Sequence, residues 1–207
     1  MKKTIVPFLV MLVLCLAACS HSSSSSSDES DGSASPTSTE QAVITEMNFA
    51  RTRPKEYVAQ RLVPQQTNPT LSGSDSSTFQ DALAEGIDQM SAMTAFGGLS
   101  FGSGLYKAAQ SWVKTQGAGT STGHDPKLYE RMEKYCSFTA AAENIAYGYS
   151  TAEDIVAALL IDDKVSDRGH RTNLLNGSYT HAGASIGSHG YYEVMCCIDY
   201  AGGYSEK

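Results

Sequence analysis

The first 39 residues of the chain cannot supply a folded core, so any fold must come from the remaining 168 of its 207 residues. Lys2 and Lys3 precede an apolar run over residues 5–16, which has the length of the hydrophobic region of a signal peptide and is too short to span a bilayer. Residues 20–39 are nearly all Ser, Thr, Asp, Glu, Gly and Pro, and such a segment cannot bury enough apolar surface to offset the entropy lost on folding. We therefore expect a disordered tether followed by one domain over residues 40–207.

The apolar run ends in Leu16-Ala17-Ala18-Cys19, which resembles the lipobox of bacterial lipoproteins. This resemblance implies that residues 1–18 are a lipoprotein signal peptide, that Cys19 carries the lipid, and that residues 19–39 tether the domain to a membrane. An ordinary signal peptide cut at the same site, or an uncleaved anchor, is the alternative. In either case we expect the domain outside the cytoplasm, in the bacterial cell envelope if the lipid is attached and secreted if it is not.

The chain is acidic, with a formal net charge of -7 at pH 7, and removal of Lys2 and Lys3 would make it more negative. It has no cluster of Lys and Arg residues, which is what binding to nucleic acid or to an anionic membrane surface requires. We therefore expect no nucleic-acid partner, and we expect contact with the bilayer to come from the N-terminal lipid.

Three cysteines lie within the predicted domain, at Cys136, Cys196 and Cys197, and an export compartment permits disulfides. Adjacent residues of a strand point to opposite faces, so Cys196 and Cys197 cannot both approach Cys136 in the same way. We expect one bridge, from Cys136 to either Cys196 or Cys197, with three free buried cysteines as the alternative. The chain contains no C-x-x-C pair, so neither a structural zinc site nor a redox motif is expected.

The first half of the domain has the apolar spacing of helices. Ser38-x-x-Gln41 and Thr151-x-x-Asp154 are capping-box patterns that predict the start of a helix. Apolar residues at helical spacing predict helices over residues 38–52, 54–62, 79–93, 105–116 and 152–162, with a loop over residues 64–78.

Strand patterns are concentrated in the second half. They predict strands over residues 145–149, 182–186 and 192–200, with a turn at residues 187–190 between the last two. This order of elements, helices first and then strands with one helix between them, is typical of an α+β fold. In such a fold the helices pack on a mostly antiparallel sheet.

Five short motifs then follow one another in a recognisable order. They are an early helix with Asn48, Arg51 and Pro54, the run S-G-L-x-x-A-A from Ser103, the pair Gly123-His124, the run E-N-I-A from Glu143, and the run G-H-R-x-N-L-L from Gly169. Together they resemble the CAP superfamily of cysteine-rich secretory proteins, antigen 5 and pathogenesis-related proteins, in particular its bacterial SCP-domain members. The resemblance implies a three-layer α-β-α sandwich with a mostly antiparallel central sheet and a central cleft.

The resemblance also implies the residues of the cleft. Its two histidines correspond to His124 and His170, and its first acidic residue corresponds to Glu143. The second acidic position, usually glutamate in eukaryotic members, corresponds to Asp162, with Asp163 next to it. Asp is one methylene shorter than Glu, which leaves open which of the two aspartates completes the set.

Two imidazoles and one or two carboxylates suit Zn²⁺ or another divalent metal with an open coordination position. The same groups are also suited to general acid and base work around a bound substrate, because histidine titrates near neutral pH. A third interpretation is structural, in which Glu143 accepts hydrogen bonds from backbone amides or from His170 and only stabilises the fold.

The sequence favours a binding module over an enzyme, because it contains no H-E-x-x-H motif, which would supply zinc ligands and a base together. We expect a non-enzymatic module whose cleft holds a divalent metal or a small ligand, a lipid among them. One alternative is a metal-dependent hydrolase of peptides or envelope material, with Glu143 as the base and metal-bound water as the nucleophile. Another is a surface protein-interaction module that uses loops such as residues 64–78, with a vestigial cleft.

Four further charged or titratable residues lie outside this set. His181 and His189 fall at predicted strand and turn positions, where we expect exposure and no role. Arg168 and Arg171 flank His170, and we expect them either to pair with Asp162, Asp163 or Asp167 or to bind an anionic ligand.

Overall fold

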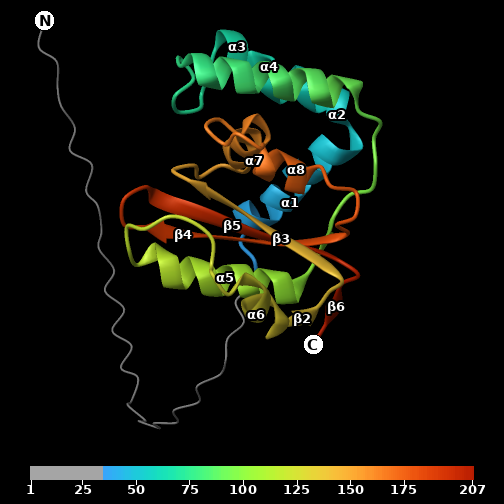
Figure 1. The fold of residues 1–207 in the computed structure, drawn as a ribbon, viewed down its shortest axis with the longest axis vertical. Helices are drawn as coiled ribbons and strands as arrows, with labels where there is room; N and C mark the ends of the chain where they lie inside the picture. Colours follow the sequence, from blue (N-terminus) through green and yellow to red (C-terminus); the bar gives the residue numbers. More distant parts are fainter. Residues whose placement is uncertain (1–34) are drawn as a thin grey trace, which may run out of the picture. The chain divides into compact units, whose positions relative to one another are not determined.

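The computed structural model describes residues 35–207, which form a four-stranded sheet covered by helices on both faces (Figure 1). The strand order is β1-β4-β5-β3, in which β1 runs parallel to β4 and the other pairs are antiparallel. The strands are β1 (Ser100–Phe101), β3 (Ala140–Tyr147), β4 (His181–His189) and β5 (Glu193–Gly202). The predicted α+β sandwich with a mostly antiparallel sheet is thus confirmed.

One face of the sheet is covered by α5 (Ser103–Gly117), with α6 (Leu128–Glu133) beside it (Figure 1). Gly183 of β4 permits this packing, because a Cβ at that position would lie 2.1 Å from the backbone nitrogen of Tyr106 in α5. The other face is covered by α1 (Ser38–Thr52), α7 (Ala152–Ile161) and α8 (Gly169–Leu174).

The remaining helices lie farther from the sheet, over α7. They are α2 (Pro54–Tyr57), which continues into the π-helical turn η1 (Val58–Leu62), then α3 (Pro64–Thr67) and α4 (Ser77–Ala92). The predicted helices over residues 54–62 and 79–93 are confirmed. The predicted loop over residues 64–78 instead contains α3, because Pro64 occupies a first-turn position, where proline is favourable.

The N-cap of the first helix lies one residue earlier than the capping pattern from Ser38 predicts. Thr37 is the N-cap, and its hydroxyl accepts the Glu40 amide at 3.2 Å while the Glu40 carboxylate accepts the Thr37 amide at 2.7 Å. Ser38 and Thr39, assigned to the tether from sequence, are therefore the first residues of α1. The predicted signal peptide, the lipidation site at Cys19 and the tether up to residue 34 lie outside the described residues.

The turn between the last two long strands lies later than predicted. β4 continues to His189, and the chain turns through residues 190–192. Gly187 pairs with Met195 inside the sheet, and a Cβ there would lie 2.4 Å from the Val113 side chain of α5. The glycine at position 187 therefore reflects close packing of helix on sheet and not a turn.

No disulfide links the cysteines of the described region, so the predicted bridge from Cys136 to Cys196 or Cys197 is wrong. Cys196 and Cys197 point to opposite faces of β5 and join separate core clusters, Cys196 under α1 and α7 and Cys197 under α5. Cys136 lies in β2 (Cys136–Ser137), in a third cluster, with its thiol directed at the Met132 carbonyl. The alternative of three free buried cysteines holds.

A smaller sheet joins β2 to β6 (Ser205–Glu206) beside α6.

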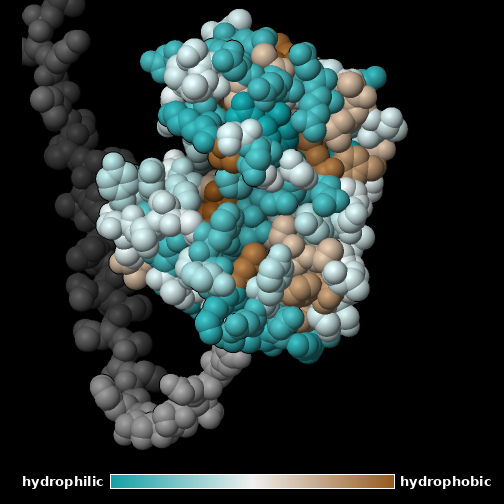
Figure 2. All heavy atoms as spheres, in the orientation of Figure 1, coloured by the Kyte–Doolittle hydropathy of each residue, from teal (hydrophilic) through white to brown (hydrophobic). Residues whose placement is uncertain are grey.

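The face of the domain shown in Figure 2 is mostly hydrophilic, in line with the acidic composition. Within residues 35–207, no helix has the length and apolar character needed to cross a membrane.

Candidate functional site

Two histidines from distant parts of the chain face each other at the edge of β3. His124 lies in the loop between α5 and α6, and His170 lies in the first turn of α8. Their ring centroids are 6.5 Å apart, with 42° between the ring planes. The fold thus brings together the two histidines that the sequence assigned to one cleft.

Each histidine is hydrogen-bonded through Nδ1 to a buried carboxylate. His124 Nδ1 lies 2.7 Å from Glu143 Oε1, and His170 Nδ1 lies 2.6 Å from Asp162 Oδ1. A carboxylate at Nδ1 favours the tautomer that carries its proton there, which leaves the Nε2 lone pair available. The four predicted residues therefore form two histidine–carboxylate pairs.

Asp162, and not Asp163, supports His170. The α7 helix ends at Ile161, and Asp162 then takes a left-handed conformation with φ of 59°. Its Oδ2 accepts the backbone amides of His170 at 2.9 Å and Arg171 at 3.2 Å. Asp162 thus fixes both the start of α8 and the orientation of the His170 ring.

Both carboxylate oxygens of Glu143 form hydrogen bonds. Oε1 bonds His124, while Oε2 accepts Arg131 Nη2 at 2.6 Å and the Cys197 thiol at 3.1 Å. Arg131 Nη2 also donates to Asp199, at 3.0 and 3.1 Å to its two oxygens. Glu143 is therefore the centre of a buried ionic network in which one guanidinium bridges two carboxyl groups.

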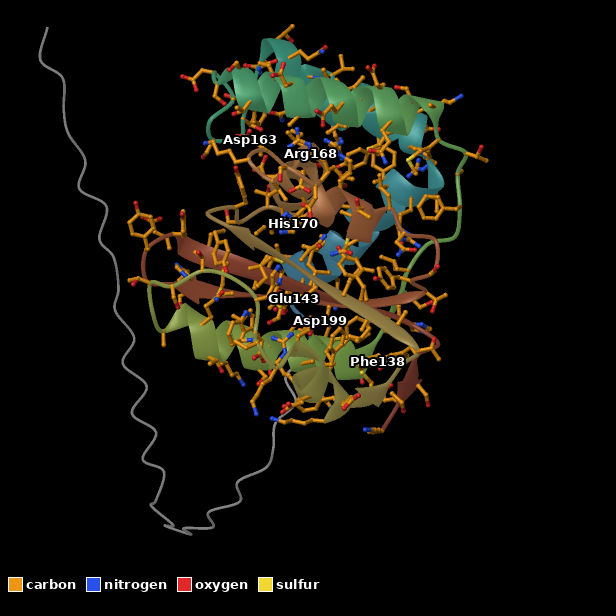
Figure 3. The ribbon with its side chains drawn as sticks, in the orientation of Figure 1. Phe138, Glu143, Asp163, Arg168, His170 and Asp199 are labelled. Carbon is orange, nitrogen blue, oxygen red and sulfur yellow. The ribbon has the colours of Figure 1, made fainter. Side chains whose placement is uncertain are left out.

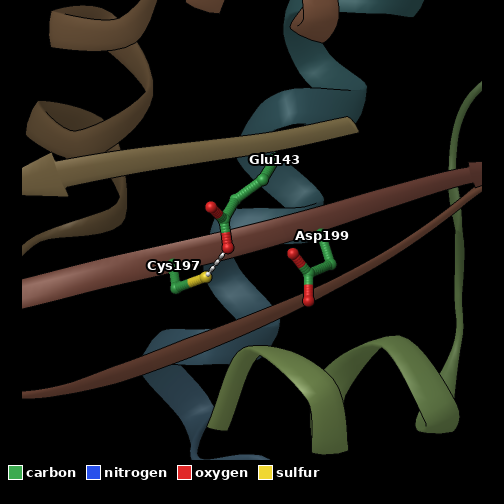
Figure 4. Close-up of side chains that lie close together, drawn as sticks. All are labelled: Glu143, Cys197 and Asp199. Carbon is green, nitrogen blue, oxygen red and sulfur yellow. Dashed lines mark hydrogen bonds between the residues drawn. The ribbon is translucent and has the colours of Figure 1, made fainter. Parts of the chain in front are cut away.

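The ligand atoms of Glu143, Cys197 and Asp199 lie within 4.8 Å of one another, a spacing that a metal ion could share (Figure 4). Arg131 already supplies the positive charge at this point, since its Nη2 bonds both carboxyl groups. We therefore assign this cluster to the internal support of Glu143 and not to a metal.

The pKa values of the two carboxyl groups in this network are shifted in opposite directions. Burial alone would raise the pKa of Glu143, but hydrogen bonds from His124 and Arg131 outweigh it and lower that pKa below its usual range. Burial raises the pKa of Asp199 well above its usual range, because Arg131 offsets only part of the desolvation. The surrounding groups thus offset the burial of Glu143 fully and the burial of Asp199 only in part.

Neither Arg131 nor Asp199 is predicted from the sequence to belong to the site. Arg131 lies in a short segment with Lys127, Glu130 and Glu133, which has the composition of an exposed helix. The available signal was Asp199, an acid within the otherwise apolar strand β5, since a buried acid needs a partner.

The loop that carries His124 is anchored to the sheet by Tyr147. The Tyr147 hydroxyl accepts the Gly123 amide at 2.9 Å and donates to Gln116 Oε1 at 2.6 Å, and Gln116 Nε2 donates to the Gly123 carbonyl at 2.8 Å. Gly123 has a φ of +116°, a conformation that glycine adopts readily. These bonds place His124 next to β3.

The prediction of an exposed His189 is wrong. His189 is buried, with Nε2 3.0 Å from the Ser121 carbonyl, and its Nδ1 accepts the amides of Tyr191 and Tyr192. Because β4 extends to this residue, the ring lies between the β4–β5 turn and the loop that leads to His124. His181 is half-buried and stacks on Tyr204, away from the cleft.

The two arginines beside His170 do not pair with the carboxylates of the neighbouring aspartates. Arg168 forms an ion pair with Glu85 at 2.7 Å and donates to the Asp162 backbone carbonyl. Arg171 is buried and donates to backbone carbonyls of Ala82, Leu160 and Ile161. Both side chains therefore connect α8 to its neighbours.

A cavity of about 340 Å³ adjoins His170. One wall is the end of β3 and the residues that follow it, 145–149, and the other is formed by α4, α7 and the loop that carries Asp163. Figure 3 shows Asp163, His170, Glu143 and Asp199 in succession from the α4 side of the domain to the α5 side. Of the two histidines, His170 therefore lines this cavity.

Residues 87–200 match the family model described as the cysteine-rich secretory protein family, CAP. No curated protein matches the chain in sequence. Three solved bacterial structures are similar to it. An extracellular SCP-domain protein from Bacillus anthracis is 22% identical, with 60% of this chain and 40% of that chain covered and a TM-score of 0.42.

An outer surface protein from Borrelia burgdorferi is 18% identical, with 60% of this chain and 88% of that chain covered and a TM-score of 0.41. A cysteine-rich secretory protein from Staphylococcus aureus is 13% identical, with 67% of this chain and 47% of that chain covered and a TM-score of 0.42. The chain thus spans less than half the length of the Bacillus and Staphylococcus proteins. Since the matched region 87–200 includes more than half of its residues, the chain belongs to the CAP family of cysteine-rich secretory proteins.

Proposed function

We propose that this protein is an exported, lipid-anchored binding module whose cleft holds a divalent metal, zinc first among them, through Nε2 of His124 and Nε2 of His170. The lipobox-like sequence before Cys19 supports the anchor, and the CAP family supports an extracellular place of action. A metal with two protein ligands keeps coordination positions open for a ligand that enters from the cavity.

The observation that carries the metal proposal is the pair of buried carboxylates at the two Nδ1 atoms. Zinc-binding histidines typically donate their other ring N–H to a carboxylate, which fixes the tautomer and raises the basicity of the ligand nitrogen. Glu143 and Asp162 are therefore supports of the histidines in this proposal and not ligands themselves.

The ring spacing fits a shared ion after a small adjustment. Zn–N bonds of about 2.1 Å place the centroids of two imidazoles on one tetrahedral ion about 5 Å apart. The rings of His124 and His170 are 6.5 Å apart, and His124 is exposed on its loop, so the approach needs no movement of the core.

The geometry disfavours the alternative of a hydrolase with Glu143 as base. Both oxygens of Glu143 are buried and already accept hydrogen bonds, and its lowered pKa makes it a weak proton acceptor. A binding role is consistent with these bonds, because in that role Glu143 needs only to orient the His124 ring.

The test is zinc titration calorimetry with elemental analysis on residues 20–207, beside His124→Ala/His170→Ala. His181→Ala is the matched control, since it removes a histidine that stacks on Tyr204 away from the cleft. We expect one zinc per chain in the wild type and the control and none in the double variant, with the same far-UV circular dichroism in all three. Equal zinc binding in the double variant, or none in the wild type, would contradict the proposal.

A further inference from the structure

The outer edge of β3 forms one wall of the cavity beside His170. Five consecutive residues, 145–149, line this wall. Side chains on one face of a strand recur at every second residue, so an unbroken run means that the cavity follows the edge of the strand and not one of its faces. β3 is the last strand of the sheet, with β5 on one side only.

The backbone groups of two residues at this edge point away from the sheet. The Gly148 amide donates to the Val194 carbonyl at 2.9 Å, and Tyr147 lies opposite Met195. In an antiparallel pair, residues alternate between those that bond the neighbouring strand and those whose N–H and C=O point away. Ile145 and Tyr147 are therefore the outward residues, and nothing in residues 35–207 hydrogen-bonds their outward groups.

Other residues limit this open edge at one end and face it across the cavity. Asn173 of α8 donates to the Glu143 carbonyl at 3.4 Å, so α8 occupies the edge up to Glu143. The facing wall includes apolar side chains and two acids, Asp162 and Asp163. Oδ1 of Asp163 is buried and has no hydrogen-bond partner within the described chain. Its apolar side chains include those of Leu71, Phe79 and Leu159.

We propose that the cavity binds an extended peptide segment of another protein, which adds to β3 as a further strand at Ile145 and Tyr147 and passes beside His170. This inference rests on the proposed function, since it takes the cleft as a binding site, and it names the class of ligand. Backbone amides and carbonyls at a period of two residues match the outward groups of β3, whereas an acyl chain would leave those groups unpaired. An apolar side chain of the peptide packs against Leu71, Phe79 and Leu159.

The first test uses amide hydrogen exchange measured by NMR on residues 20–207. The probe is a library of acetylated hexapeptide amides with apolar residues at alternate positions. We expect exchange at Ile145 and Tyr147 to be fast in the free protein and to slow at least about tenfold when a library peptide is bound. Ala146 and Gly148 are internal controls, because their amides already bond β5.

The second test uses N-methylated copies of the best hexapeptide. Methylation of the amides that pair with β3 is expected to weaken binding by about tenfold each, and methylation of the intervening amides is expected to change it little. Equal effects at all positions would overturn the proposal, and so would binding without slowed exchange at Ile145 and Tyr147. Binding of octanoate with no binding of any hexapeptide would assign the cavity to a lipid instead.

Both tests are repeated on chelator-treated protein and on His124→Ala/His170→Ala. Slowed exchange at Ile145 in the absence of bound zinc would support the peptide proposal even if the metal site fails. Stoichiometric zinc in the wild type with no peptide effect on Ile145 or Tyr147 would keep the metal site and overturn the peptide proposal.

Discussion

His124 and Glu143 share a 2.7 Å hydrogen bond that joins an exposed imidazole to a buried carboxylate. The bond with Glu143 raises the pKa of His124 above its usual value, because the carboxylate favours the imidazolium. Protons compete with zinc for the same ring, so zinc affinity should fall as the pH falls through this raised pKa. Calorimetric titration at pH 8 and pH 6 checks the direction, and an affinity that rises toward pH 6 would contradict it.

The Glu143→Gln variant should lower the pKa of His124, since a neutral amide no longer favours the charged ring. A histidine NMR titration measures the change. Glu130→Gln removes an exposed carboxylate from α6 and serves as the control, which should leave His124 unchanged.

Asp162 and Asp163 should differ in their effect on metal binding. Asp162→Asn weakens the bond that orients His170, and removal of such a support typically costs about 10–100-fold in metal affinity. Asp163→Asn should leave the zinc affinity within about twofold, since Asp163 makes no contact with His170. Zinc titration of the two variants side by side checks this, and an equal loss in both would show that their roles were misassigned.

Replacement of Arg131 by methionine should destabilise the domain by about 3–5 kcal/mol, because it leaves Glu143 and Asp199 buried without their cation. Urea denaturation measures the change. Lys127→Met, at the N-cap of the same helix, breaks an exposed pair with Glu130 and should cost less than about 1 kcal/mol. Similar costs for the two variants would mean that the buried network contributes little.

Gly183 should be among the least replaceable glycines of the domain. A Cβ there would lie 2.1 Å from the Tyr106 backbone nitrogen, so Gly183→Ala requires α5 to move off β4 and should cost about 1–3 kcal/mol or more. Gly97→Ala is the control, since a Cβ at that position meets nothing within 4 Å. Thermal unfolding of both variants measures the difference, and a stable Gly183→Ala protein would argue against the close packing described here.

Cys19 should be the site of lipid attachment. In a bacterial host that processes lipoproteins, Cys19→Ser should abolish incorporation of radiolabelled palmitate and release the domain from the membrane fraction. Cys15→Ser changes a cysteine inside the predicted signal peptide and should leave labelling intact. Labelling that persists in Cys19→Ser would exclude the lipobox assignment.

The sequence predicted most helices of the fold because their signals are local. The α5 and α7 helices follow directly from apolar spacing and from caps such as Thr151, whose hydroxyl accepts the Asp154 amide. The β4–β5 turn was misplaced because Gly187 and Gly190 look alike in sequence. Only the packing of Val113 against Gly187 distinguishes a glycine inside a strand from one in a turn.

The candidate site was predicted through family resemblance for its histidines but not for their supports. His124 and His170 belong to short motifs with fixed neighbours. Arg131 and Asp199 are 68 residues apart, and their pairing depends on the fold that brings α6 over β5. No local pattern distinguishes Arg131 from the exposed charges around it, so the buried network becomes visible only in three dimensions.

The three free cysteines of the domain also determine what its folding requires. Each thiol lies in a different part of the core, and burial raises the pKa of Cys136 to about 11, which keeps it protonated and unreactive. Since no covalent cross-link joins residues 35–207, this region needs neither an oxidase nor an isomerase to reach its native covalent state. The fold of residues 35–207 therefore does not depend on a disulfide, and we expect a reducing agent to leave its stability unchanged.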